Sequence, residues 1–160
     1  MSNHGITVDY INPFIEATIH TFQTKCSLAP TRERLFLKGD GEKVYGVSEI
    51  IGLGSETTGV VVLNLPEVAA IRVGEKLAGQ DFTALTAGVG DGVGELTRFI
   101  AEDAKNRLVQ KGYKSEIGLT KVVTGRNYIT AQSKVTTCVV VSFASEVGRF
   151  CLEFSLQKVA

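Results

Sequence analysis

The sequence predicts one domain with the element order helix, three strands, two helices, three strands (α-βββ-αα-βββ). Apolar residues recur with helical spacing in three segments, and runs rich in β-branched residues, separated by glycines, fill the intervals between and after them. A length of 160 residues is typical of one domain with one core. We therefore expect a single domain over residues 1–160, with residues 1–8 as a flexible tail.

The first helix is predicted from about Asp9 to Cys26. Asp9 is suited to cap it, and Pro13 falls in its first turn, where a proline is tolerated. Pro30 marks the end of the segment. The apolar residues with helical spacing are Phe14, Ala17, Ile19 and Phe22.

The next segment reads as three short strands. Glycines separate Leu35–Leu37, Val44–Leu53 and Thr57–Leu65, each rich in β-forming residues. Strands so close in sequence usually pair with one another. We therefore predict a three-stranded meander.

Two helices follow. Pro66 at the first helical position opens the second, which runs to about Leu77 and is closed by Gly79. The third runs from about Asp91 to Gln110 and stops at Gly112.

Three further strands are predicted at Glu116–Thr124, Val135–Phe143 and Arg149–Leu156, with Ser145–Gly148 as the turn between the last two. The similarity of Val60–Leu63 to Val139–Ser142 hints at an internal duplication, although the run is too short to establish one.

Composition excludes several classes of function. Seventeen basic residues balance seventeen acidic ones, which argues against a nucleic-acid-binding protein, and no apolar run approaches the roughly 20 residues of a membrane helix. The N-terminus lacks a secretory signal, so we expect a cytoplasmic location. The three widely spaced cysteines, Cys26, Cys138 and Cys151, favour reduced, buried thiols over a disulfide framework.

Few residues suit conventional catalytic or metal chemistry. The histidines are His4, in the expected tail, and His20, in the first helix, and a lone helical histidine is usually structural or solvent-facing. The glycine run Gly88–Gly94 departs from both G-x-G-x-x-G and the phosphate-binding P-loop. Its composition favours either a helix start that packs closely against a neighbour or a frayed segment.

The third helix carries the most informative polar residues. At about 100° per residue, one stripe faces the core, formed by Val89, Val93, Leu96, Ile100 and Ala104. Asp91, Glu95, Arg98 and Glu102 lie on the opposite side. In the structural interpretation, Arg98 pairs with Glu95 and Glu102, each pair stabilising the helix by about 0.2 to 0.5 kcal/mol. A functional surface is the other interpretation.

Five segments carry a resemblance to a known family: Ile11–Ile19, Ile50–Gly54, Gly59–Val62, Val93–Thr97 and Val122–Asn127. Together with the last two strands they are similar to the CheX branch of the CheC/CheX/FliY chemotaxis phosphatases, over nearly the whole chain. The resemblance implies an α+β fold with helices packed on an antiparallel sheet. It also implies a homodimer whose sheet continues across the interface.

Members of this family dephosphorylate CheY-like response regulators through an E-x-x-N motif on an exposed helix. The glutamate engages a lysine of the receiver domain, and the asparagine positions the water that attacks the aspartyl phosphate. An amide suits this role because it accepts a hydrogen bond from water without adding a charge. The resemblance therefore implies a phosphorylated CheY-like partner that holds its own Mg²⁺, and no cofactor on this chain.

This sequence departs from that motif. Glu95 stands where the glutamate belongs, but Arg98 occupies the asparagine's place, and Glu102 replaces a small residue that usually follows. Arginine only donates hydrogen bonds, so it can stabilise phosphoryl charge but cannot accept one from the water. The resemblance implies catalytic positions at Glu95 and Arg98 and partner-binding positions at Asp91, Glu95 and Glu102.

A second acidic–amide pair, Asp103-x-x-Asn106, lies further along the same helix. Helical spacing turns Asp103 toward the core side, which argues against a relocated site. Three hypotheses remain for the chain: a receiver phosphatase, a dimeric receiver-binding module without hydrolysis, and a plain dimeric scaffold.

Overall fold

The computed structural model describes residues 8–37, 47–53, 57–84, 86–112, 117–124 and 139–158. Its elements are α1 (Val8–Cys26), β1 (Thr31–Leu37), β2 (Val47–Leu53), β3 (Thr57–Leu65), α2 (Glu67–Ala78), α3 (Ala87–Gln110), β4 (Ile117–Thr124), β5 (Val139–Ala144) and β6 (Phe150–Lys158). The predicted α-βββ-αα-βββ order is confirmed. None of the described helices is long and apolar enough to cross a membrane.

Two helix starts differ from the prediction by a few residues. Because α1 begins at Val8, Asp9 lies inside the helix instead of capping it, and Pro13 is its sixth residue. Near a helix start, the missing proline N–H removes only one hydrogen bond, to the carbonyl four residues earlier. Pro66 is the N-cap of α2, one position before the predicted one. Apart from Val8, the predicted tail lies outside the described residues.

The helix ends agree with the glycine signals. Gly79 is left-handed, with φ of 71°, and its N–H donates to the Glu75 carbonyl at 2.9 Å. Gly112, just after α3, has φ of 93°. A positive φ costs glycine little because it has no Cβ. Both helices therefore end close to the glycines that predicted their ends.

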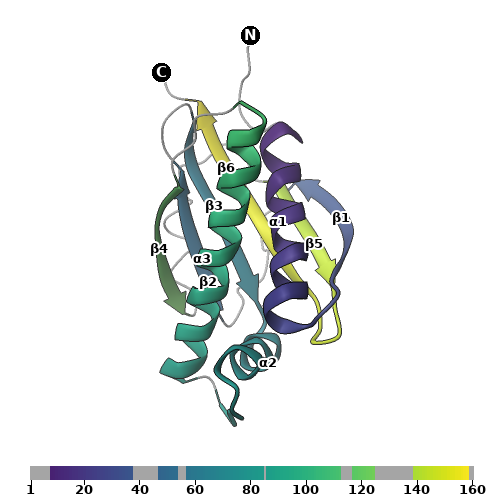
Figure 1. The fold of residues 1–160 in the computed structure, drawn as a ribbon, viewed down its shortest axis with the longest axis vertical. Coiled ribbons are helices and arrows are strands. Elements are labelled where there is room, and N and C mark those ends of the chain that lie inside the picture. The colour runs from purple at the N-terminus through teal and green to yellow at the C-terminus, as the bar shows by residue number, and fades with distance from the viewer. Residues whose placement is uncertain are drawn as a thin grey trace.

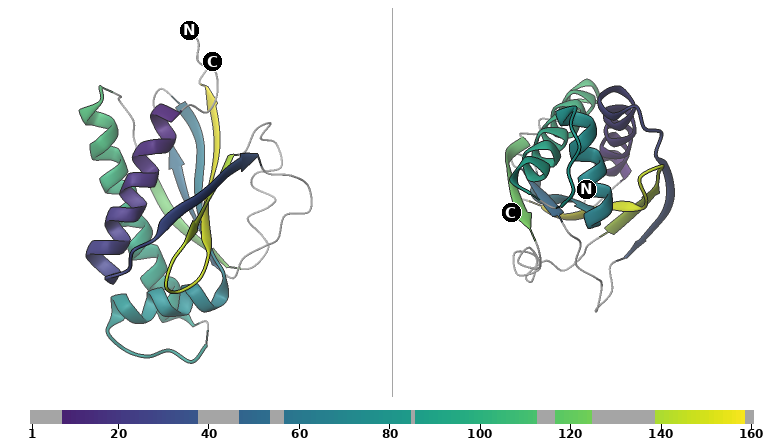
Figure 2. Two further views of the ribbon diagram at one scale, coloured as in Figure 1. Left: turned by 90° about the vertical axis from the view of Figure 1, so that its right-hand side faces the viewer. Right: turned by 90° about the horizontal axis from the view of Figure 1, so that it is seen from below.

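The six strands form one antiparallel sheet in the order β1-β5-β6-β3-β2-β4, with helices on one face (Figures 1 and 2). The two predicted hairpins, β2–β3 and β5–β6, are confirmed, the second through a turn in which Ser145 and Gly148 exchange backbone hydrogen bonds. The predicted first three-stranded meander is wrong, since β1 pairs with β5. Only residues 27–30 join α1 to β1, which keeps β1 at the sheet edge beside α1 (Figure 1).

The sheet order has an internal symmetry. If β1, β2 and β3 are exchanged with β4, β5 and β6 respectively, the result is the same strand order counted from the opposite edge of the sheet. In this correspondence β3 matches β6, whereas the similar apolar runs at Val60–Leu63 and Val139–Ser142 lie in β3 and β5. These runs are therefore not topological equivalents, although the two halves do share one strand plan.

The core lies between the helices and one face of the sheet. The ring of Phe150 from β6 stacks on Phe22 of α1 at 4.6 Å and on Phe143 of β5 at 5.0 Å between centroids. Phe14 of α1 meets Phe154 edge-on. All five residues of the predicted α3 stripe are fully buried: Val89, Val93, Leu96, Ile100 and Ala104. This stripe fixes which side of α3 faces outward.

The glycine run begins α3 and crosses α2 at backbone contact. A Cβ on Gly92 would lie 3.1 Å from the Gly74 Cα, and one on Gly74 would lie 3.1 Å from the Val89 Cα. Figure 2 shows α2 lying across the end of the molecule where α3 begins. The close-packing interpretation of the run is confirmed, and α3 starts at Ala87, four residues before the predicted start.

Gly92→Ala is expected to destabilise the protein by about 1 to 3 kcal/mol, because the new methyl group must displace the backbone of α2. Alanine has a better helix propensity than glycine by about 1 kcal/mol, and this gain is expected to be outweighed. Urea unfolding measures the change. Asn106→Ala, at an exposed position of the same helix, is the control; a Gly92→Ala variant as stable as the unmutated protein would contradict the close contact.

Candidate functional site

The four predicted site residues lie together on the outward face of α3. Asp91, Glu95, Arg98 and Glu102 are all exposed, on the side of the helix opposite the buried stripe. Eleven residues separate the first from the last, which is about 16 Å along the axis. We call these four residues the outward face of α3.

The charges of the outward face do not pair with one another. Among the described residues, no ion pair within 4.0 Å joins Arg98 to Glu95 or to Glu102, although the spacing would allow both. The solvent-exposed face of the structural interpretation is confirmed, but the predicted pairing of Arg98 is not. Its guanidinium and carboxylates face solvent and are accessible to a partner.

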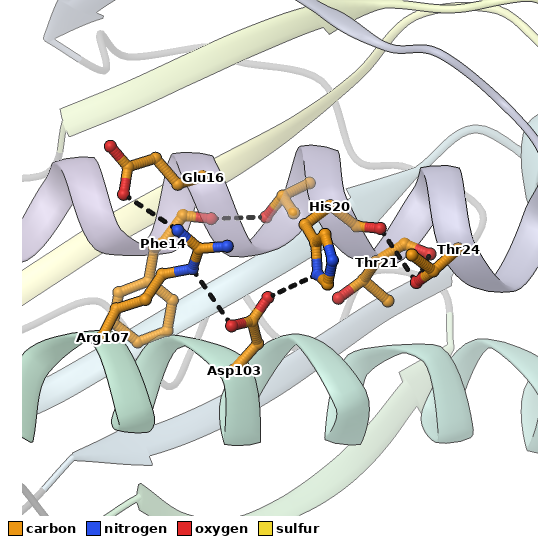
Figure 3. Close-up of polar contacts among 8 residues, drawn as sticks. Phe14, Glu16, His20, Thr21, Thr24, Asp103 and Arg107 are labelled. Atoms are coloured by element: carbon orange, nitrogen blue, oxygen red, sulfur yellow. Dashed lines mark hydrogen bonds and ion pairs between the residues drawn. The ribbon is translucent and has the colours of Figure 1, made fainter.

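On the flank of α3 that faces α1, in contrast, the charged side chains are paired (Figure 3). Asp103 accepts a hydrogen bond from the Arg107 Nε at 3.0 Å and contacts the His20 Nδ1 at 3.1 Å, while the Arg107 Nη1 donates to Glu16 Oε1 at 3.2 Å. At the far end of α1, the Lys25 ammonium lies 4.1 Å from the Phe99 ring centroid. We call these contacts the α1–α3 seam.

Along the seam, α1 and α3 run antiparallel and their contacts are regularly spaced. Positions 16, 20 and 25 of α1 meet positions 107, 103 and 99 of α3, in steps of about one helical turn. Both carboxylate oxygens of Asp103 are engaged, and its side chain is only 23% exposed. This engagement agrees with the prediction that Asp103-x-x-Asn106 is not a relocated site, and His20 has the expected structural, solvent-facing role.

Spacing alone predicted neither Glu16 nor Arg107 as part of this seam. The signal was present as two i,i+4 pairs, Glu16 with His20 and Asp103 with Arg107. Pairing them across helices requires the register of α1 against α3, which helical periodicity does not contain.

Asp103→Ala is expected to lower the free energy of unfolding by about 1 kcal/mol, because it removes the centre of the seam in a partly exposed setting. Thermal or urea unfolding measures the loss. Lys105→Ala, two residues away and exposed, is the matched control and should change stability little. Equal stabilities for the two variants would show that the seam contributes nothing measurable.

A second polar group, which sequence reasoning missed, lies inside the sheet. On three neighbouring strands, the Ser48 hydroxyl donates to Asn64 Oδ1 at 2.5 Å, and Asn64 Nδ2 donates to Glu153 Oε2 at 2.7 Å. All three side chains are buried. Hydrogen bonding of this kind offsets the cost of burying polar groups and specifies which residues pair across β2, β3 and β6.

The two cysteines that the structure describes are buried, and the Cys151 Sγ accepts a hydrogen bond from Asn64 Nδ2 at 3.8 Å. Cys26 and Cys151 are buried, and burial raises the pKa of the Cys26 thiol to about 11. A thiol with so high a pKa is almost entirely protonated at neutral pH and is a poor nucleophile. Cys138 lies outside the described residues.

A comparison with models of protein families identifies the family of this chain. The sequence model described as "Chemotaxis phosphatase CheX" matches residues 47–144, which is more than half of the chain and includes the outward face of α3. The chain belongs to the CheX family. Among curated proteins, no sequence matches this CheX family member.

Solved structures agree with this family and with the predicted α+β fold. A CheC-like superfamily protein from Shewanella sp. PV-4 is 27% identical, with a TM-score of 0.82 over 95% of this chain and 99% of the other. Chemotaxis protein CheX from Vibrio vulnificus is 24% identical, with a TM-score of 0.81 over 93% and 99%. The CheX–CheY–BeF3–Mg²⁺ complex from Borrelia burgdorferi matches at 20% identity, with a TM-score of 0.80 over 95% and 100%.

The resemblance places the family's E-x-x-N motif on α3 of this chain. Glu95 and Arg98 stand where the resemblance places the glutamate and the asparagine, and both side chains are exposed. Between them, Thr97 is buried and its hydroxyl donates to the Val93 carbonyl at 2.8 Å. The burial of Thr97 turns the side chains of Glu95 and Arg98 outward.

Proposed function

We propose that this CheX family member docks its outward α3 face on the phosphorylated receiver domain of a CheY-like response regulator and accelerates loss of the aspartyl phosphate. The observation that carries the proposal is the exposure of Glu95 and Arg98 on one face of α3, at the positions where the resemblance places the motif. The match to a CheX solved in complex with CheY supports the choice of partner. Asp91, Glu95 and Glu102 are the proposed contacts.

In this proposal Arg98 stabilises the negative charge of the phosphoryl group and does not position the attacking water. Its planar guanidinium presents five N–H donors, and such a fork matches phosphoryl oxygens. Arginines supplied by a partner protein accelerate phosphoryl transfer in GTPases by about 10³ to 10⁵. The receiver holds the Mg²⁺ and its own attacking water, and this chain contributes Glu95 for docking.

A second candidate function is a receiver-binding module that hydrolyses nothing. The observation that favours it is the chemistry of Arg98, which has no atom able to accept a hydrogen bond from the attacking water. Docking would survive the presence of arginine at position 98, because it depends on the exposed face as a whole. The two candidates therefore share a partner and differ only in turnover.

Phosphate loss from a phosphorylated CheY-type receiver of the same organism separates them. The unmutated protein is expected to accelerate the loss. Arg98→Ala is expected to reduce this acceleration at least about tenfold, since it removes the guanidinium, and Glu95→Ala is expected to abolish it. Arg98→Asn restores the amide and should exceed the unmutated rate.

The outcomes are distinct. Acceleration by Arg98→Asn but not by the unmutated protein would establish the binding module. Absence of both acceleration and binding would contradict the whole proposal. Asn106→Ala, exposed on the same helix, serves as the control for non-specific effects.

We also propose that the protein is a homodimer joined at the free edge of β1. This strand pairs only with β5 among the described strands, and Leu35 and Leu37 are 49% and 69% exposed on it. Toward its start the edge carries a register shift between Arg32 and Arg34, which hinders strand addition there. Pairing with a second copy would therefore involve the leucine end.

A Leu35→Lys/Leu37→Lys double variant is expected to be monomeric, because lysines on an edge strand oppose pairing. Light scattering on a sizing column would give the unmutated protein twice the chain mass of 17.2 kDa and the variant that mass once. Val68→Lys, which replaces an exposed apolar residue on α2, should remain dimeric. An unmutated monomer, or a dimeric double variant, would contradict the proposed interface.

A further inference from the structure

Six of the seven charged residues of α3 fall into two groups, and the seventh, Lys105, is exposed three residues after Glu102. Those on the flank toward α1, Asp103 and Arg107, are engaged in the seam at 3.0 to 3.2 Å. Those on the outward face form no ion pairs with one another, although Arg98 lies three residues after Glu95 and four before Glu102. The charges on the flank are therefore paired within the protein. Those on the outward face are, in chain order, negative at Asp91 and Glu95, positive at Arg98 and negative at Glu102.

The spacing of the two glutamates is regular. Seven residues separate Glu95 from Glu102, so their side chains leave the helix only about 20° apart and about 10 Å apart along the axis. Arg98 lies between them, about 60° to one side of Glu95. A partner surface that complements this pattern presents a cation, an anion and a second cation in that order.

We propose that Glu102 is a specificity-determining residue that selects receivers carrying a second basic side chain, about 10 Å from the lysine that Glu95 engages. This inference rests on the proposed function, in which the phosphoryl group supplies the anion opposite Arg98. Glu102 lies one turn beyond Arg98 and adds a negative charge close to that anion. A receiver with a basic side chain opposite Glu102 neutralises the repulsion, and a receiver without one does not.

Such a residue acts by exclusion as much as by attraction. Discrimination between similar partners often depends on a repulsive element that only the correct partner offsets. A charge at the rim of an interface acts mainly on the association rate and its dependence on salt. These two quantities therefore report on Glu102 in a way that a change in helix stability would not.

The test uses purified CheY-type receiver domains of the same organism, activated with beryllofluoride and Mg²⁺. Association rates are measured at low and high salt for the unmutated protein and for Glu102→Gln. The variant is expected to bind the preferred receiver about threefold to tenfold more slowly at low salt, with a weaker salt dependence. For Glu102→Gln, the association rates of the preferred receiver and of the other receivers should differ less than they do for the unmutated protein.

Glu67→Gln is the matched control, because it removes the same charge from an exposed position on α2. Its rates should match those of the unmutated protein. If Glu102→Gln retains the unmutated rates and preferences while Glu95→Gln binds weakly, the role of Glu102 is disproved and the proposed function stands. If no activated receiver binds the unmutated protein, both fail.

Discussion

The one-sided burial of α3 is the constraint on which the site depends. Val93, Leu96 and Ile100 are fully buried, and rotating the helix to hide its charges would expose this stripe to water. Each such side chain stabilises the fold by about 1.5 to 3 kcal/mol when buried. An exposed ion pair contributes at most about 1 kcal/mol. The core therefore determines the direction of the outward face, and the charges on that face have little influence on it.

Two further contacts fix the position of α3 along α1 and against α2. The α1–α3 seam sets its register along α1, in steps of about one turn from Arg107 to Phe99. At the start of the helix, the contact of Gly92 with Gly74 brings the backbones of α3 and α2 together. A helix held along one flank and at one end presents exposed side chains in a reproducible geometry, which recognition of a partner surface requires.

Sequence reasoning succeeded where the signal is local. The apolar stripe of α3, the left-handed Gly79 and the turn at Ser145–Gly148 each follow from spacing or from one residue's conformational freedom. It failed where the partner is remote in sequence. Neighbouring strands predicted a meander, but β1 pairs with β5, more than 100 residues away in the chain. The seam was missed for the same reason, since i,i+4 pairs do not specify the helix that they face.

The position of Arg98 shows how the fold and the chemistry of this protein can vary independently. Its side chain is exposed and forms no ion pair with the described residues, so the core, the seam and the glycine contact do not depend on it. Surface substitutions of this kind usually change stability by less than about 0.5 kcal/mol. This chain presents a guanidinium where the resemblance places an amide, and the packing that holds α3 does not depend on which of the two groups stands there.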